Sequence, residues 1–585
     1  MTPHSASTLL ALAPLAFIAA SCQPAPPSTA LNAAFVDPSA PAGGDGSRGR
    51  PFRLLAEALT LTDPDLSEIA LSEGDHELPA QITFTRPRIL KGRGADRTRV
   101  FTPGGAMRWT VSAPLTLEAL TLQGGLSVQG QAPITLHKVA HDDPEKPLEF
   151  KDIPKVTAQG LRLRRGGGLI LARVGAATLR QVSVEGASAG IQAGEVGQLE
   201  ATQIAVRRAG GTAISLVDSR ATITGLTIEG AARREGSLGD GVQVTRGALT
   251  LKDALISDVA HRALSIKLGA RVDLEGVRVS RAKLAALYVD MASEVEARGL
   301  RASESRTCVL VTSRARLRLE GGSIGPCEAH GMLISDGARV EVTGSTVEGC
   351  AKGLISAIGE GVGLSVSTST LRGAQDMCVN VASTDAPVRL RANTIEGCQG
   401  AGVGLLRLSD AILDDNTILG VEANPGLGGD MAHGLAVVDS RVELLGNRVS
   451  DTRGVGISLL RASGVLARNT VADTGDVGIS IGDPAEDGAT LVEGNRVQRA
   501  TLAGVALINH EATVTGNTIS GTRGRLLQGG HGVLLTQGGR GLIIRNSLLD
   551  NSGYGIRGPC AGDPKNKENT FKNNNLGDID GEPCP

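Results

Sequence analysis

Two stretches of the chain decide the fold, NRVSDTRGVGISLL at residues 447–460 and NTVADTGDVGISIG at residues 469–482. Each begins with Asn, places an aliphatic residue two positions later, and reaches Gly-Ile after a short turn. The second stretch repeats the first after 22 residues (469 − 447). Apolar and polar residues alternate inside each stretch, which is typical of β-strands. Short strands repeated at a fixed interval predict a β-solenoid.

The same repeat extends over most of the chain. Its aliphatic position recurs at Val184, Val206, Ile228, Ile256, Val279, Ala302, Ile324, Val347, Leu371, Ile395, Ile418, Val449, Val471, Val497, Ile519, Leu548 and Phe571. Twelve of the sixteen intervals are 22 to 24 residues, and the other four indicate coils with inserted loops. A column of corner glycines follows the turn, as at Gly331, Gly402, Gly434 and Gly456. Glycine suits a corner where the backbone of one coil closely approaches the next.

A second column lies two residues before the aliphatic position, and its chemistry changes along the chain. It begins aliphatic, passes through Gly322, Ser345 and Ser369, and then becomes Asn in eight successive coils. These asparagines are Asn393, Asn416, Asn447, Asn469, Asn495, Asn517, Asn546 and Asn569. Side-chain amides stacked at the spacing of β-strands can bond to one another and to the turn backbone. The column therefore predicts a structural asparagine ladder.

With this ladder and its Gly-aliphatic step, the chain resembles the right-handed parallel β-helix proteins of the pectin-lyase-like superfamily. Residues 35–59 and 88–122 resemble the opening segment and first coils of such domains. The resemblance implies an all-β, single-stranded right-handed parallel β-helix of about 20 coils of 22–24 residues with an N-terminal helical cap. We expect a first strand and capping helix over 35–80, the β-helix over 81–559, and a C-terminal coil and cap over 560–585.

The N-terminus has the features of an export signal. An apolar stretch from Leu9 to Ala20 leads into Ser21-Cys22, which resembles the bacterial lipobox. We expect a signal peptide over 1–21, a lipidated Cys22 and a flexible tether over 22–34, with ordinary secretion as the alternative. In similar lipoproteins a residue such as Gln23 goes with outer-membrane sorting, so an outer membrane-anchored protein, periplasmic or surface-facing, is expected.

Composition narrows the classes of partner. The net charge of −2 argues against a nucleic-acid binder. Outside the signal no run of 18 apolar residues occurs, so the only expected membrane contact is the lipid anchor. Aromatic residues make up only 2% of the chain, although sugar-binding clefts commonly use aromatic platforms. We expect a monomer without a cofactor or metal site, with calcium possible only if the protein is a lyase.

Seven cysteines follow Cys22, and exported proteins can oxidise them. Cys560 and Cys584 bracket the C-terminal tail and are expected to pair. Cys327 and Cys350 occupy the same column in consecutive coils, about 5 Å apart, so they are also disulfide candidates. Buried free thiols are the alternative.

Catalytic candidates are few. Asp414 and Asp415, followed by His433-Gly434, are similar to motifs of polygalacturonases, but Asn416-Thr417 leads to Ile418 where those enzymes have Asp. His330, His433 and His531 all precede a corner glycine, four coils apart or about 19 Å. That separation excludes a shared metal ion, and a variable, solvent-facing position is the favoured interpretation.

Inserted loops are the most plausible place for recognition. The insertions at 231–239, 421–431 and 523–530 all fall between the aliphatic position and the corner glycine, hence on one flank of the rod. These insertions could form a ligand groove, or they could be surface loops that the fold merely tolerates, and the sequence leaves both interpretations open. The sequence favours a binding or structural scaffold for a polysaccharide or protein partner over an enzyme. The alternative is a polysaccharide lyase, glycoside hydrolase or epimerase of the pectin-lyase-like group.

Overall fold

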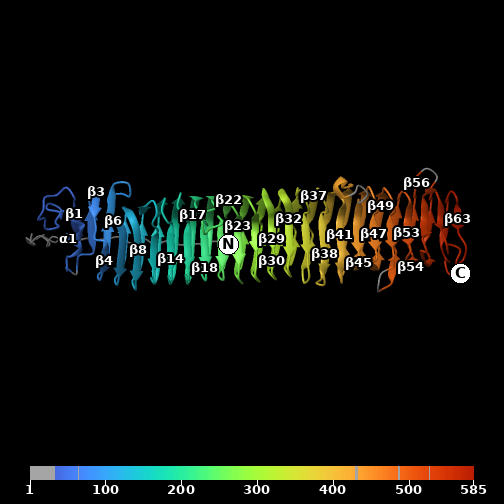
Figure 1. The fold of residues 1–585 in the computed structure, drawn as a ribbon, viewed down its shortest axis with the longest axis horizontal. Helices are drawn as coiled ribbons and strands as arrows, with labels where there is room; N and C mark the ends of the chain where they lie inside the picture. Colours follow the sequence, from blue (N-terminus) through green and yellow to red (C-terminus); the bar gives the residue numbers. More distant parts are fainter. Residues whose placement is uncertain (1–32, 64, 428–431, 485–487, 526–527, 585) are drawn as a thin grey trace, which may run out of the picture.

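The computed structural model describes residues 33–63, 65–427, 432–484, 488–525 and 528–584. They form one long rod whose coils follow the sequence from one end to the other (Figure 1). The predicted signal peptide over 1–21, Cys22 and the tether as far as residue 32 lie outside the described residues. Residues 33 and 34 already belong to the first strand, β1 (Ala33–Val36).

The rod is a right-handed parallel β-solenoid of about 22 turns, which confirms the predicted fold. In a regular coil three short strands follow one another, for example β45 (Arg441–Leu445), β46 (Arg448–Thr452) and β47 (Ile457–Leu460). Each pairs in parallel with the equivalent strand of the next coil, β48 (Ser463–Ala467), β49 (Thr470–Thr474) and β50 (Ile479–Gly482). Three strand stacks result. We name them face A, face B and face C, after β45, β46 and β47 in that order.

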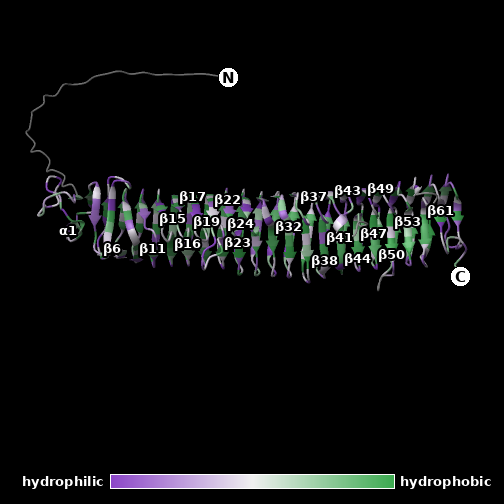
Figure 2. Ribbon diagram, turned by 45° about the horizontal axis from the view of Figure 1, so that its top comes forward, coloured by the Kyte–Doolittle hydropathy of each residue, from purple (hydrophilic) through white to green (hydrophobic). Residues whose placement is uncertain are grey.

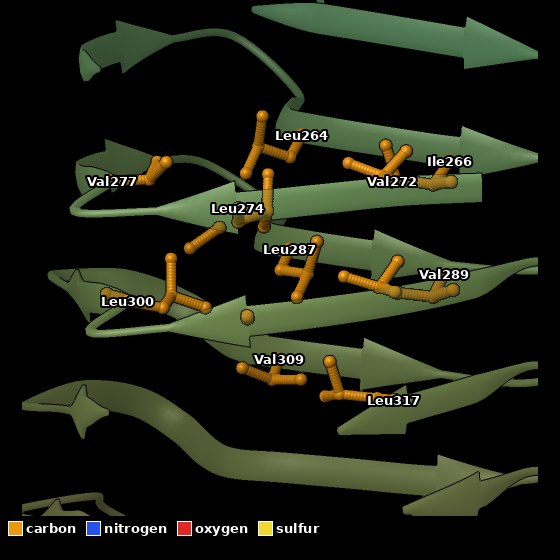
Figure 3. Packing of buried hydrophobic residues seen from close by; sticks show 14 of the residues in the cluster. Leu264, Ile266, Val272, Leu274, Val277, Leu287, Val289, Leu300, Val309 and Leu317 are labelled. Atoms are coloured by element: carbon orange, nitrogen blue, oxygen red, sulfur yellow. The ribbon is translucent and has the colours of Figure 1, made fainter. Parts of the chain in front are cut away.

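The core is a narrow column of aliphatic side chains between the three faces. Figure 3 shows Leu264, Leu287 and Val309 of face C lying one beneath another, opposite Val277 and Leu300. The same alternation of buried and exposed positions gives the strands their mixed colouring in Figure 2. Most inward residues are Val, Leu, Ile and Ala, and large side chains such as Trp109 and Phe150 are few.

The asparagine column lies buried at the turn between faces A and B. Asn469 donates from Nδ2 to the carbonyl of Leu444 and to Oδ1 of Asn495, 2.8 and 2.9 Å away. Its own Oδ1 accepts from the backbone N–H and Nδ2 of Asn447 at 2.9 and 3.0 Å. The same bonds recur between each neighbouring pair from Asn393 to Asn569. The ladder thereby satisfies the buried polar groups of the turn.

The N-terminal helical cap expected over 35–80 is not supported. The only α-helix of the described residues, α1 (Leu55–Leu59), has five residues and contributes Leu55 and Ala58 to the core. The rest of the segment contains β1, β2 (Glu68–Leu71), β3 (Gly74–Glu77) and turns. Thr60 and Thr62 follow the helix directly, and β-branched residues favour extended backbone.

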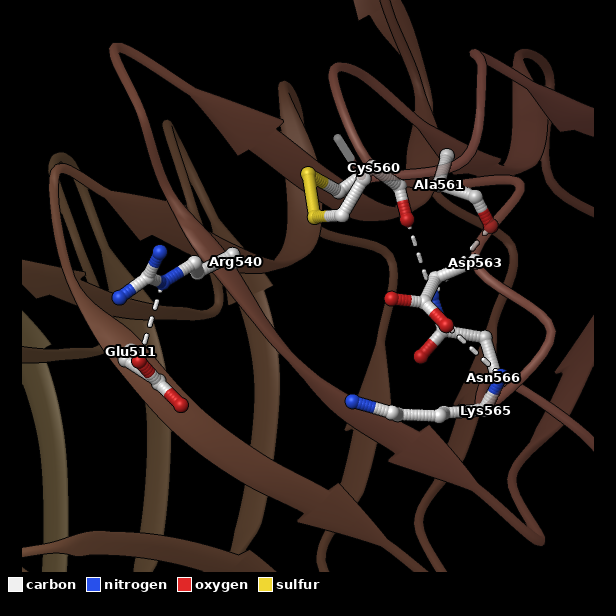
Figure 4. Close-up of a disulfide and its surroundings, with 8 residues drawn as sticks. Glu511, Arg540, Cys560, Ala561, Asp563, Lys565 and Asn566 are labelled. Carbon is white, nitrogen blue, oxygen red and sulfur yellow. Dashed lines mark hydrogen bonds and ion pairs between the residues drawn. A yellow bond between two sulfur atoms is a disulfide. The ribbon is translucent and has the colours of Figure 1, made fainter.

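The opposite end of the rod is closed by the strands β62 (Thr570–Lys572) and β63 (Gly577–Asp580). A disulfide joins Cys560 to Cys584, the two cysteines that the sequence singled out (Figure 4). Nearby, Asn566 donates from Nδ2 to the carbonyls of Cys560 and Ala561 at 3.1 and 3.3 Å. Among the described residues, none of the helices has the length and apolar character needed to cross a membrane.

Candidate functional site

The other disulfides differ from the expected pairing. Cys327 bonds to Cys308, not to Cys350, and Cys378 bonds to Cys398. Cys327 and Cys350 are indeed stacked in parallel register, but stacked side chains point the same way rather than at each other. Cys308 and Cys378 are in register with Gly331 and Gly402, so they occupy the corner-glycine column.

This geometry explains why Cys350 is a buried free thiol. In both bonded pairs a corner cysteine reaches a cysteine 19 or 20 residues later, at the inward position of the next coil. The corner position that would serve Cys350 is Gly331, where an added Cβ would lie 3.3 Å from the Cys350 sulfur. Burial raises the pKa of the Cys350 thiol to about 12, so the thiol stays protonated and unreactive.

The flank between faces B and C carries a groove of about 1080 Å³, which we name the flank groove. One wall is formed at Ala423, within the 421–431 insertion, and at Ala432, directly after it; the insertion also contains the 3₁₀ turn η1 (Pro425–Leu427). The other wall begins at Arg523, beside the small hairpin of β56 (Gly524–Arg525) and β57 (Gln528–Gly529). The floor spans three coils without such insertions, about 14 Å at the strand spacing.

Six charged side chains line the flank groove, Asp451, Arg453, Asp473, Asp476, Arg499 and Arg523. Arg499 binds both oxygens of Asp473 at 2.6 Å and holds the pKa of that carboxyl below its usual range. Arg453 is paired with Glu422. Asp451, Asp476 and Arg523 make no ion pair with any described residue. The groove therefore offers free carboxylates and a free guanidinium to a ligand.

Asp414 and Asp415 do not join His433. Asp414 ends β42 (Ala411–Asp414) and Asp415 lies in the turn before β43 (Thr417–Val421). His433 lies beyond the far end of β43, about 16 Å along this five-residue strand. Asp414 is paired with Arg391 at 3.6 Å. Asp415 has φ 54°, the left-handed conformation that Gly446 adopts in the next coil, so it serves the turn.

The three His-Gly histidines do not share a solvent-facing position, contrary to the expectation. His531 is only 2% exposed, and His433 Nδ1 is buried without a hydrogen-bond partner in the described part of the chain. His531 accepts at Nδ1 from the backbone N–H of Tyr554 at 3.1 Å and stacks against the Tyr554 ring. Burial, with the nearby Arg557, lowers the pKa of His531 to about 4. The side chain of His531, which precedes the corner glycine, thus packs against the next coil instead of facing solvent.

A second polar cluster lies on the outer side of face C, next to the 231–239 insertion. We name it the Tyr288 cluster, and its members are Asp240, His261, Arg262, Lys267, Tyr288 and Asp290. They come from β23 (Arg262–Lys267), β26 (Ala285–Val289) and the turns that flank these strands. The carbon of the Arg262 guanidinium lies 3.5 Å from the Tyr288 ring centroid, and the phenol donates to Asp290 Oδ2 at 2.6 Å.

Charge and burial set the chemistry of the Tyr288 cluster. Burial and the hydrogen bond to Asp290 raise the pKa of Tyr288 to about 12, so the phenol is protonated at neutral pH. Burial, aided by Arg262, lowers the pKa of Lys267. Arg262 Nε and Ser265 Oγ are buried without hydrogen-bond partners among the described residues. The two cations can neutralise an acidic group placed beside the phenol.

The sequence located the flank of the groove but not its carboxylates. Asp451 and Asp473 have φ 55° and 54°, so they are also turn residues, and a turn aspartate gives no distinct signal in sequence. The Tyr288 cluster carries no motif because its members come from three coils: Asp240 lies 21 residues before His261, and Arg262 lies 26 residues before Tyr288. The described residues contain no group of three or more side chains suited to a metal ion.

Comparison with solved structures gives only remote similarity. The Dettilon tailspike protein is 16% identical with a TM-score of 0.33, over 57% of this chain and 62% of that one. The catalytic domain of a GH87 α-1,3-glucanase is 10% identical with a TM-score of 0.30, over 49% and 61%. The periplasmic alginate epimerase AlgG is 12% identical with a TM-score of 0.19, over 70% and 77%. The chain thus spans less than two thirds of the tailspike and glucanase chains.

No curated protein matches the chain. The family described as the right handed beta helix region matches residues 240–389, 377–530 and 469–581. Together these ranges cover more than half of the 585 residues. The chain therefore belongs to the right handed beta helix family.

Proposed function

We propose that the protein is an exported scaffold that binds a polysaccharide or protein partner in the flank groove. The observation that carries this proposal is the groove itself, with two insertions as walls and unpaired Asp451, Asp476 and Arg523 between them. The lining contains no aromatic side chain, and its floor has small residues such as Gly454 and Gly475. A hydroxyl-rich chain, held by hydrogen bonds rather than by stacking, fits such a surface.

The proposal includes attachment to the membrane. Three disulfides are typical of an exported protein. A lipid on Cys22 would tether the rod to the outer membrane, on its periplasmic or external side, and leave the flank groove open to a partner. We propose that the rod acts as a monomer, with no cofactor and no nucleic-acid partner.

A binding panel tests this function. The protein from residue 23 onward would be titrated by calorimetry with polygalacturonate, alginate, chondroitin sulfate and dextran. The double variant D451N/D476N should weaken binding of the neutral dextran about tenfold, since each carboxylate accepts hydrogen bonds from the hydroxyl groups of the ligand. The matched control is D253N/D273N, two exposed aspartates outside the groove. Equal affinity for all three proteins would contradict the groove assignment.

The Tyr288 cluster supports a second candidate function, an enzyme that acts on an acidic polysaccharide. Arg262 and Lys267 would neutralise a sugar carboxylate held beside the Tyr288 phenol. The same panel, followed by absorbance of unsaturated products and by reducing ends with and without calcium, tests this candidate. Turnover that is lost in Tyr288→Phe and kept in D451N/D476N would replace the scaffold by an enzyme.

A further inference from the structure

The outer side of face A carries a charge pattern that breaks in the middle of the rod. The strands concerned are β24 (Arg271–Glu275), β27 (Glu294–Arg298), β30 (Arg316–Glu320), β33 (Arg339–Thr343), β36 (Gly363–Ser367) and β39 (Val388–Arg391). One outward column runs through Arg271, Glu294, Arg316, Arg339 and Gly363 in successive coils. Its first three members alternate in sign, and Glu294 binds Arg271 at 3.4 Å and Arg316 at 3.2 Å.

The alternation ends at Arg339. Its neighbour on one side is Arg316, which Glu294 already neutralises, and its neighbour on the other side is Gly363, which has no side chain. A Cβ added at Gly363 would come no closer than 3.4 Å to Arg339, so the position is open rather than filled. The coil after Gly363 presents Ala386 and Pro387 at this edge of the groove, and neither carries charge.

A second outward column adds two more arginines. It runs through Glu296, Arg318, Glu341, Ser365 and Arg389. Glu296 is bound to Arg298 at 3.3 Å, outside the groove. Arg318, Arg339 and Arg389 make no ion pair with any described residue, and Glu341 is the one acidic lining residue left unpaired. Three free guanidinium groups against one free carboxylate leave an excess of positive charge.

These side chains line an elongated groove of about 760 Å³, which we name the arginine groove. It crosses five coils, about 19 Å at the strand spacing. Its floor is Gly363, Ser365 and strand backbone, and no aromatic or large aliphatic side chain points out of it to receive apolar groups. Unpaired guanidinium groups on three coils of one face suit a chain that carries repeated anionic groups, since arginine can bind each carboxylate or sulfate with two hydrogen bonds.

We propose that the arginine groove is a second binding site, separate from the flank groove, for an acidic polysaccharide whose carboxylates or sulfates bind Arg318, Arg339 and Arg389. The two grooves lie on different sides of the solenoid, face A and the flank between faces B and C. A long chain therefore need not occupy both, and each site can be tested alone.

The test compares two pairs of exposed arginines, each taken from neighbouring coils. R318Q/R339Q removes charge inside the groove, whereas R278Q/R301Q removes a pair on face B that does not line it. Binding of polygalacturonate and of chondroitin sulfate would be measured at two salt concentrations. We expect R318Q/R339Q to weaken binding about tenfold and to reduce its salt dependence, and R278Q/R301Q to change neither. Polygalacturonate reports on carboxylates and chondroitin sulfate on both groups, so the pair separates the two chemistries.

A second variant acts in the opposite way, by filling the groove. Gly363→Glu would place a carboxylate next to Arg339 and neutralise its charge. Its backbone is not left-handed, so the side chain brings no backbone strain. Binding should fall as in R318Q/R339Q while the melting temperature stays within a few degrees of wild type.

Equal losses in both arginine pairs, or an equal loss of neutral dextran binding in R318Q/R339Q, would overturn the proposal. Failure of the flank groove is distinguished because D451N/D476N leaves the arginine groove intact. If D451N/D476N binds dextran normally and R318Q/R339Q loses polygalacturonate, the arginine groove stands and the proposed function of the flank groove falls.

Discussion

The N-terminal and C-terminal halves of the solenoid fill the same corner with different chemistry. At the turn between faces A and B the first half places Val182, Ile204, Leu226, Val277 and Leu300, each no more than 1% exposed. The second half places asparagines there, also buried, from Asn393 at 2% exposed onward. Ser345 and Ser369 stand between the two series and already bond to the turn, since Ser369 Oγ accepts from the Ser345 N–H at 3.1 Å.

The comparison shows that the turn between faces A and B must be packed without voids and must leave no buried polar group without a hydrogen bond. Aliphatic side chains and asparagines are two ways to meet both requirements. In the aliphatic half the side chain is apolar, so it needs no partner of its own. In the asparagine half each amide uses its oxygen and nitrogen for four bonds, as Asn469 does with Asn447, Leu444 and Asn495. Replacing one residue of the asparagine ladder should therefore reduce the free energy of unfolding more than replacing one aliphatic residue of the first half. The reason is that each asparagine is the hydrogen-bond partner of its neighbours.

The largest effect is expected for Asn469→Leu in the middle of the ladder. The N–H and Nδ2 donors of Asn447 would lose their acceptor while remaining buried. Two orphaned donors cost roughly 4 kcal/mol. Because long solenoids do not unfold in one step, hydrogen exchange of the flanking coils is the right measurement, beside chemical denaturation. Unchanged protection of residues 441–500 would mean that the ladder bonds contribute nothing to stability.

The matched change in the aliphatic half is Leu226→Ala. It removes buried methyl groups but leaves no polar group unpaired, so about 3 kcal/mol should be lost. Measured in the same way, loosening should be confined to the coils adjoining Leu226. A larger loss here than in Asn469→Leu would reverse the ranking of the two corners.

Acid offers another way to weaken the asparagine half. The pKa of His531 is lowered to about 4 in the folded protein, from about 6.5 in an unfolded chain. Between these values the unfolded chain binds a proton that the folded one does not, so the stabilisation is complete above pH 6.5 and is lost as the pH falls toward 4. We expect a loss of about 2 kcal/mol near His531, measured by hydrogen exchange at pH 7 and pH 4.5. His531→Gln should remove this local pH dependence, and its persistence would assign the effect to another group.

The smallest effect is expected at the junction. Ser369→Asn would extend the ladder by one coil, because Asn393 Oδ1 already accepts from the Ser369 N–H at 3.0 Å. One added amide hydrogen bond should raise the stability of this region by about 1 kcal/mol. The matched control is Ser367→Asn, two residues earlier and not in the ladder column. Destabilisation by Ser369→Asn would show that the neighbouring aliphatic coils leave no room for the amide.

Much of this architecture was accessible from sequence because one coil position recurs many times. The aliphatic, glycine and asparagine columns predicted the β-solenoid, and they place the turn at Asn469 where the structure has it. The N-terminal segment follows no repeat, so its opening helix was overestimated. The pairing of Cys327 with Cys308 was also missed, because the corner column was interpreted as a glycine column and not as a place from which a side chain reaches the next coil.

The candidate sites were less accessible for a physical reason. The insertions at 421–431 and 523–530 mark the walls of the flank groove, and this much is visible in sequence. The Tyr288 cluster and the arginine groove depend on outward side chains of separate coils meeting in register. Such neighbours are one coil apart in the sequence. An outward position accepts many residue types, so no pattern in a single sequence marks the positions that form a site.

The most direct test of the central claim, that the rod binds without catalysing, is hydrogen–deuterium exchange with and without the polysaccharide that binds most tightly in the panel. The two groove assignments predict protection of residues 451–502, of residues 316–391, or of both, with the polymer recovered at unchanged length. Protection centred on residues 240–290, together with shortened or unsaturated chains, would contradict a scaffold and place an active site at Tyr288.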